Sequence, residues 1–76
     1  MAAPFTIAGR RDGHTAVVVL AGELDLVAKP LLRAHVRTCL DDDAITAITI
    51  DLAALTFIDS TGIGALIGCL RLAEGT

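Results

Sequence analysis

A hydroxyl pair, Ser60 and Thr61, follows an acid and precedes an apolar run in this sequence. An acid or hydroxyl in that position is typical of a helix N-cap, where a side-chain oxygen accepts free backbone N–H groups. The same place suits a phosphoryl group, because the N–H groups and the helix dipole both favour negative charge. The residues therefore allow two roles for Ser60, a structural cap and a phosphorylation site. Thr61 is a second, weaker candidate for modification.

Catalysis by Ser60 is a third reading, and the sequence argues against it. A hydrolytic serine needs a base that activates it and an oxyanion hole. The chain has no G-x-S-x-G elbow, and neither His14 nor His35 has an evident route to Ser60. Its acids and its two isolated cysteines show no metal-ligand spacing. We expect a protein that is not an enzyme and that holds no metal or cofactor.

Hydropathy patterns predict the elements that position these residues. A short strand over 5–8 and a polar turn over 9–14, with an Asp-Gly hairpin signal, lead into a second strand over 15–21. The continuous apolarity of that second strand indicates burial on both faces. A helix beginning near Val27 and an alternating strand over 45–52 follow. Strand, helix and strand imply a parallel pair joined by a right-handed crossover.

The first helix has Leu32, Val36 and Leu40 on its expected core face, supported by Leu31 and Cys39. Proline in its first turn loses no intrahelical hydrogen bond. A second, basic face is expected to be solvated, and it carries Lys29, Arg33 and Arg37.

The second helix begins at Asp59-Ser60, after a short apolar turn that follows the third strand. Its expected buried stripe consists of Ile63, Leu66, Ile67 and Leu70. Gly64 and Gly68 lie four apart, with Gly62 just before them. Because glycine costs a helix about 1 kcal/mol relative to alanine, we expect close approach of this helix to the sheet or to a partner. The start of the helix lies beyond a parallel strand's carboxyl end, where open α/β sheets place functional sites.

Composition restricts the function further. The 76 residues are 54% hydrophobic with a mean hydropathy of +0.70, and they allow one domain. The longest apolar run, over 16–21, is far too short to span a membrane, and the N-terminus has no signal-peptide pattern. We expect a cytoplasmic protein. A net charge of −3 and a lack of stacking aromatics argue against nucleic acid as a partner.

Two motifs together resemble a known family. Asp51-Leu52 followed by Phe57-Ile58-Asp59-Ser60-Thr61-Gly62-Ile63-Gly64 is similar to the signature of STAS domains, the anti-sigma factor antagonists of bacteria. Upstream, Gly22-Glu23-Leu24-Asp25 resembles the second recurrent motif of that family, in the expected order. The resemblance implies an α/β fold with a mixed sheet and helices packed on it. It also implies that residues 1–76 form a single, partial domain, because a complete STAS domain continues with another strand and further helices.

The resemblance also implies a function. An anti-sigma factor antagonist binds an anti-sigma factor that is a serine kinase, which frees a sigma factor for transcription. Phosphorylation at Ser60 by that ATP-dependent kinase ends the binding, and a phosphatase resets it. The expected partner-binding residues are Glu23, Asp25, Asp59, Ser60, Thr61, Gly62 and Gly64. The role of Glu23 and Asp25 remains open: they could bind the partner, be solvated loop acids or cap the start of the first helix.

Two further expectations follow from the resemblance. STAS folds also serve as adaptor subunits of transporters or signalling complexes without a phosphorylation cycle, which is the alternative function. The absent C-terminal part would leave an unpaired strand edge and apolar surface, so we expect self-association of this chain.

Overall fold

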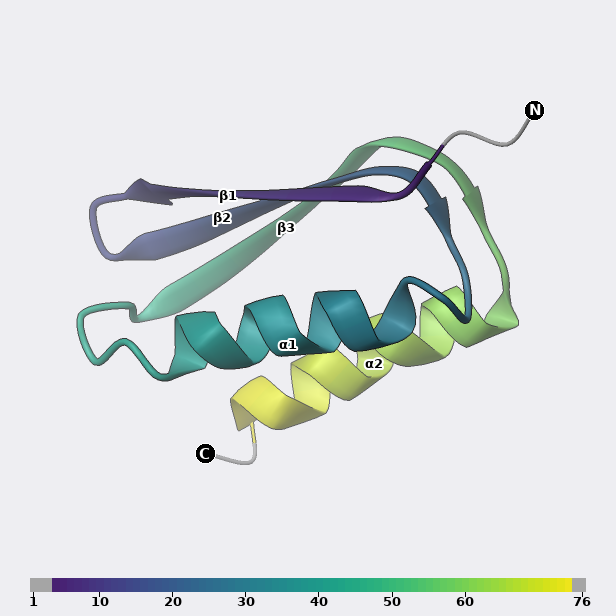
Figure 1. Cartoon of the computed structure of the whole chain (residues 1–76). Helices are drawn as coiled ribbons and strands as arrows, with labels where there is room; N and C mark the ends of the chain where they lie inside the picture. Colours follow the sequence, from purple (N-terminus) through teal and green to yellow (C-terminus); the bar gives the residue numbers. More distant parts are fainter. Residues whose placement is uncertain (1–3, 75–76) are drawn as a thin grey trace.

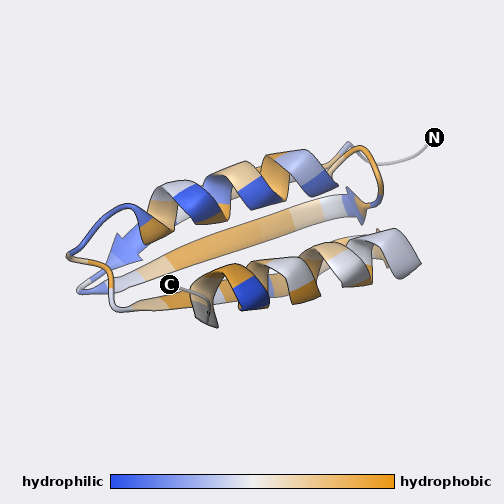
Figure 2. Ribbon diagram, turned by 90° about the horizontal axis from the view of Figure 1, so that it is seen from below, coloured by the Kyte–Doolittle hydropathy of each residue, from blue (hydrophilic) through white to orange (hydrophobic). Residues whose placement is uncertain are grey.

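The computed structural model describes residues 4–74, and these form a mixed α/β fold. In chain order the elements are β1 (Thr6–Asp12), β2 (Thr15–Leu24), α1 (Lys29–Leu40), β3 (Ala47–Ile58) and α2 (Ser60–Glu74). The strands form one sheet in the order β1-β2-β3, with β1 antiparallel and β3 parallel to β2. Both helices lie side by side on one face of that sheet (Figure 1; from the helical side in Figure 2). The predicted fold class and strand pairing are confirmed.

The β1–β2 hairpin is tighter than its sequence suggests. Asp12 pairs with Thr15, so only Gly13 and His14 form the turn, and Gly13 has a φ of +62°. A two-residue turn can follow the twist of the strands when its first residue adopts positive φ, which glycine does without strain. The predicted hairpin is therefore confirmed, but residues 9–12 extend β1 rather than forming part of the turn.

The core lies between β2 and the two helices. Val18, Leu20 and Leu24 of β2 are fully buried, and Leu32 of α1 packs into the same cluster. Leu31 was expected to support this core and is instead 54% exposed. One helical residue is a rotation of about 100°, so the neighbour of a fully buried leucine is turned away from the sheet.

The third strand is longer than predicted because it contains two irregularities. Its pairing with β2 shifts between Val19 and Ala21 and again between Gly22 and Glu23, each time with one extra residue in β3. The Thr56 hydroxyl donates to the Gly22 carbonyl at 3.2 Å near the second shift. Extra residues bend a strand, and Figure 1 shows β2 and β3 curving together toward the helices. The stretch over 53–58 was predicted as a turn and is the curved end of β3.

Helix α2 packs through its small residues, which corrects the predicted stripe. Ala65 and Cys69 are buried, whereas Ile63, Ile67 and Leu70 are 50%, 48% and 59% exposed. Periodicity marks which side chains share a face, but small side chains let a helix come close to its neighbours. Of the predicted stripe only Leu66 packs, partly buried, against the core.

The glycines of α2 differ in how much space surrounds them. A Cβ added at Gly64 or Gly68 would meet nothing within 4 Å, so neither glycine is required for approach to the sheet. A Cβ at Gly62 would stand 2.3 Å from the Leu24 carbonyl oxygen. Helix α2 therefore does approach the sheet closely, but it does so at Gly62. An approach of Gly64 to a partner stays a prediction.

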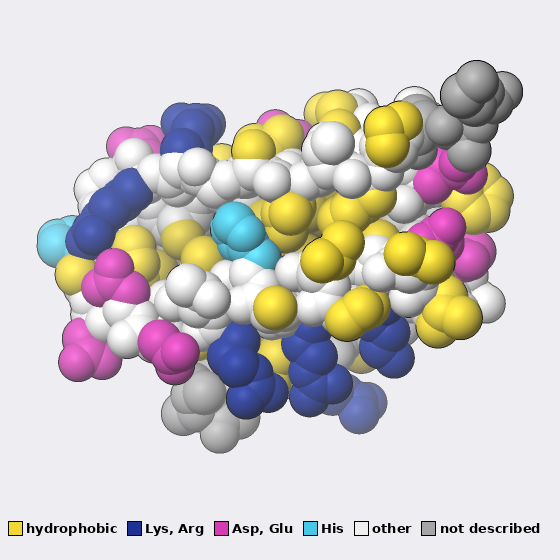
Figure 3. Space-filling view, viewed as in Figure 1, with side chains coloured by type: hydrophobic (Ala, Val, Ile, Leu, Met, Phe, Trp, Pro, Cys, Tyr) yellow, Lys and Arg dark blue, Asp and Glu magenta, His cyan; other side chains and the backbone are white. Residues whose placement is uncertain are grey.

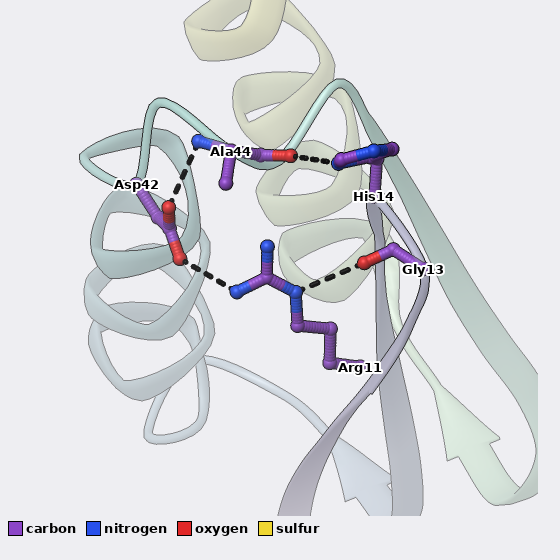
Figure 4. Close-up of polar contacts among 5 residues, drawn as sticks. All are labelled: Arg11, Gly13, His14, Asp42 and Ala44. Carbon is purple, nitrogen blue, oxygen red and sulfur yellow. Dashed lines mark hydrogen bonds and ion pairs between the residues drawn. The ribbon is translucent and has the colours of Figure 1, made fainter.

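At the end of the sheet away from Ser60, polar contacts tie the hairpin to the loop after α1 (Figure 4). Arg11 bonds the Gly13 carbonyl through Nε at 2.9 Å and the Asp42 carboxylate through a terminal nitrogen at 3.4 Å. The ring Nδ1 of His14 lies 2.9 Å from the Ala44 carbonyl. We call residues 11–14 and 41–46 the hairpin end.

Candidate functional site

The two sequence motifs meet at one end of the molecule. Glu23 is the register partner of Phe57, and Leu24 is the partner of Ile58, so the ends of β2 and β3 lie side by side. α2 begins at Ser60, directly beyond this pair. We call residues 23–28 and 57–63 the Ser60 end; it is the right-hand end in Figure 1. The structure thus brings together the acidic segment and the hydroxyl pair, as predicted.

Asp59, not Ser60, caps α2. Its Oδ1 accepts the N–H of Gly62 at 2.8 Å, and its main-chain carbonyl accepts the N–H of Ile63 at 3.0 Å. Ser60 is consequently the first residue of the helix, and its side chain is exposed. Within residues 4–74 its hydroxyl forms no hydrogen bond. The structural explanation for Ser60 as the cap is therefore wrong, and the hydroxyl is available for chemistry.

The first turn of α2 is held against the end of β2 by a backbone contact. The space that a side chain at position 62 would need is occupied by the Leu24 carbonyl group and, at 2.9 Å, by Cγ1 of Ile58. Gly62 is buried. Because main-chain atoms cannot move aside as a flexible side chain can, this contact fixes where Ser60 stands relative to the acidic segment.

Asp25 has a structural role of its own. Its Oδ1 accepts the N–H groups of Val27 at 3.1 Å and Ala28 at 3.3 Å, and its carbonyl accepts the N–H of Lys29 at 3.2 Å. Such bonds satisfy donors ahead of a helix that has no side-chain cap at its own N-cap residue. The structure thus gives Asp25 a role at the start of α1, and partner binding by Glu23 and Asp25 stays a prediction.

The Ser60 end is acidic and has no compensating ion pairs among the residues described. Glu23, Asp25 and Asp59 are all partly buried there, and the ion pair of the described chain is the one between Arg11 and Asp42 at the other end. Three like charges on one surface give it a negative potential. In residues 4–74 no group of three His, Cys, Asp or Glu side chains is arranged to hold a metal ion.

Exposed apolar side chains surround the acids. Figure 3 shows yellow side chains beside magenta ones at this end of the visible face. Sequence reasoning missed this patch, since it treated the region as a turn or as buried core. Its large members are Leu26, Val27, Leu31, Phe57, Ile58 and Ile63, each between 38% and 75% exposed. Side chains of this size gathered at a surface mark a protein interface more often than chance.

This chain belongs to the STAS domain family, whose pattern matches residues 6–74. Over 61 residues it is 37% identical to an anti-sigma F factor antagonist of Lysinibacillus sphaericus, a match that covers 80% of this chain and 52% of that protein. The chain therefore spans about half the length of that curated relative.

Solved structures of anti-sigma factor antagonists also resemble this chain. The unphosphorylated anti-sigma factor antagonist SpoIIAA matches with a TM-score of 0.71 and 33% identity, over 95% of this chain and 64% of that one. An antagonist from Mycobacterium paratuberculosis matches with a TM-score of 0.80 and 29% identity, over 93% and 62%. The phosphorylated form of the Bacillus protein SpoIIAA matches with a TM-score of 0.70 over 95% and 64%.

Proposed function

We propose that this protein is an anti-sigma factor antagonist that is switched off by phosphorylation of Ser60. It binds an anti-sigma factor with serine kinase activity, and this binding frees a sigma factor. The kinase transfers the γ-phosphoryl group of ATP to the Ser60 hydroxyl, after which the two proteins separate, and a phosphatase restores the hydroxyl. The protein acts by binding rather than by catalysis, in the cytoplasm, and ATP belongs to its partner.

One observation carries the proposal: the Ser60 hydroxyl is exposed and has no hydrogen-bond partner within residues 4–74, while Asp59 provides the cap. A kinase can therefore reach Ser60 without opening the helix. The phosphoryl group adds roughly −1.5 to −2 charges at neutral pH, at a helix start that tolerates them. It would also stand beside three carboxylates. We expect the effect at the interface, as repulsion of the partner, and not as unfolding.

The proposed partner-binding surface is the Ser60 end together with the exposed side of the first turns of α2. Glu23 supplies charge, while Asp25 and Asp59 supply charge and hold the two helix starts. Gly62 fixes the relative position of the segments. Gly64 offers an exposed backbone that a partner could approach closely. Thr61 is partly buried, which leaves Ser60 the more accessible of the two hydroxyls.

The test is phosphorylation of matched variants by the cognate anti-sigma kinase with ATP. Wild type and Thr61→Ala should each gain one phosphate by intact-mass measurement, mapped to Ser60, whereas Ser60→Ala should gain none. Ser60→Ala should still bind the anti-sigma factor, and phosphorylated wild type should bind at least about tenfold more weakly, a loss of about 1.4 kcal/mol.

Equal phosphate uptake by wild type and Ser60→Ala would remove Ser60 from the mechanism. A wild-type protein that binds a partner but accepts no phosphate would instead support the adaptor function.

A further inference from the structure

A groove of about 340 Å³ opens beside the acids of the Ser60 end, on the side toward β1 and α1. Its lining combines the apolar side chains of Phe5, Val27 and Leu31 with the carboxylates of Glu23 and Asp25. Val27 is 75% and Leu31 54% exposed, so these branched side chains stand in solvent without a partner among the described residues. Large exposed apolar side chains next to two carboxylates are the kind of surface that marks a protein interaction site.

Of the two acids that line the groove, Glu23 is the one whose side chain has no partner among the described residues. Asp25 already accepts two backbone N–H groups through Oδ1. The Glu23 side chain makes no hydrogen bond and no ion pair within the described chain. Its whole carboxylate is therefore available to a cation in the groove. Acidic lining side chains select against acidic partners and favour a segment that carries arginine or lysine.

The groove is continuous with the proposed phosphorylation surface. Glu23 forms part of the groove and is also the register partner of Phe57, which is 50% exposed on the strand leading to Ser60. Leu24, the next residue, contacts Gly62 through its carbonyl group. A partner that covers Ser60 would therefore reach the groove by extending across the ends of β2 and β3.

We propose that this groove binds a segment of the anti-sigma factor in which a large apolar side chain stands next to an arginine or lysine. The apolar side chain packs on Phe5, Val27 and Leu31, and the cation pairs with Glu23. Apolar anchors at the centre of an interface, with charges at the rim, are the usual anatomy of a tight protein contact. This inference rests on the proposed function, since it describes how the same partner is recognised.

The test compares the affinity of the anti-sigma factor for three serine variants of the whole chain, by titration calorimetry. Val27→Ser and Leu31→Ser should each raise Kd roughly tenfold, as truncation of an interface anchor does. The matched control is Leu52→Ser on β3, which is 42% exposed and lies outside the groove, and its Kd should equal that of wild type. Val27 precedes α1, so its replacement leaves helix formation unchanged.

A fourth variant tests the cation. Glu23→Gln should weaken binding and should also reduce the dependence of Kd on salt concentration, because it removes the charge and keeps the size. An unchanged salt dependence would exclude an ion pair at Glu23.

Two outcomes separate this inference from the proposed function. If wild type binds the anti-sigma factor and takes phosphate at Ser60, but Val27→Ser and Leu31→Ser behave like Leu52→Ser, the groove proposal fails alone. If wild type neither binds nor is phosphorylated, both proposals fail. Sedimentation that shows a wild-type dimer dissociated by Leu31→Ser would assign the groove to a second copy and overturn its assignment to the anti-sigma factor.

Discussion

The hairpin end and the Ser60 end of this small domain are built in opposite ways. At the hairpin end, polar side chains are used internally: Arg11, His14 and Asp42 each bond to the chain itself (Figure 4). At the Ser60 end, a backbone contact at Gly62 and two aspartate caps hold the chain. Large apolar side chains and one free hydroxyl remain exposed there.

The difference indicates which end interacts with other molecules. The hairpin end uses Arg11, His14 and Asp42 within the chain and has no large exposed apolar side chain, so it offers a partner little apolar surface. The Ser60 end is fixed by contacts that need no large side chain, so its large side chains are available for binding. Substitutions can test whether the two ends are as different in stability as they are in construction.

The largest effect should come from Gly62→Ala. A Cβ 2.3 Å from the Leu24 carbonyl oxygen forces α2 or β2 to shift, and overpacking of this kind costs about 1–3 kcal/mol. The matched control is Gly68→Ala, where a Cβ meets nothing within 4 Å and stability should rise by up to about 1 kcal/mol through helix propensity. Urea unfolding of both variants measures the difference. Equal stabilities would mean that the contact at Gly62 does not hold the Ser60 end.

A smaller effect is expected from the cap of α2. Asp59→Ala removes the acceptor for the Gly62 N–H and should cost about 1 kcal/mol of unfolding free energy. Ser60→Ala should change that free energy by less than about 0.5 kcal/mol, because the hydroxyl is exposed and unbonded. Thermal or urea unfolding of the two variants beside wild type measures these differences in stability. A larger loss of unfolding free energy from Ser60→Ala than from Asp59→Ala would show that Ser60 is the cap.

The smallest effect should come from the hairpin end. Arg11→Met keeps the aliphatic part of the side chain and removes the bonds to Asp42 and Gly13. Both partners of the ion pair are about half exposed, so the loss should stay below about 1 kcal/mol and should shrink at high salt. Denaturation in low and high salt tests this. A loss above about 2 kcal/mol would show that the polar contacts hold this end as firmly as Gly62 holds the other.

Much of the fold could be predicted from local pattern. The apolar run of β2 and the proline in the first turn of α1 lie in the elements that their patterns predict. The Asp12-Gly13 signal predicts the hairpin, although the turn itself is formed one residue later, by Gly13 and His14. The position of Ser60 beyond the carboxyl end of a parallel strand followed from topology, whereas its proximity to the Glu23 segment was implied by the family resemblance. These features depend on neighbours along the chain or on a rule of connection.

The errors have physical causes that hydropathy alone does not contain. Hydropathy favours Ile63 and Ile67 as buried, but α2 contacts its neighbours through Ala65 and Cys69, because a close approach requires small side chains. Likewise Asp59 and Ser60 are both good caps by type, and only the helix start decides between them. The continuation of β3 through 53–58 depends on pairing with the curved end of β2. The burial on α2 and the length of β3 are thus set by neighbours distant in sequence, whereas the cap depends on the residue at which the helix begins.

The burial of Cys69 has a consequence for how the motions of α2 can be observed. Its side chain is 3% exposed, and burial raises the pKa of its thiol above the ordinary value, against a smaller lowering by Arg33. Alkylating reagents attack thiolates that they can reach, so the folded state protects this sulfur both sterically and electronically. Labelling then proceeds only through molecules in which α2 has moved off its neighbours. The alkylation rate of Cys69 therefore reports how often the helix that begins at Ser60 opens in the native protein.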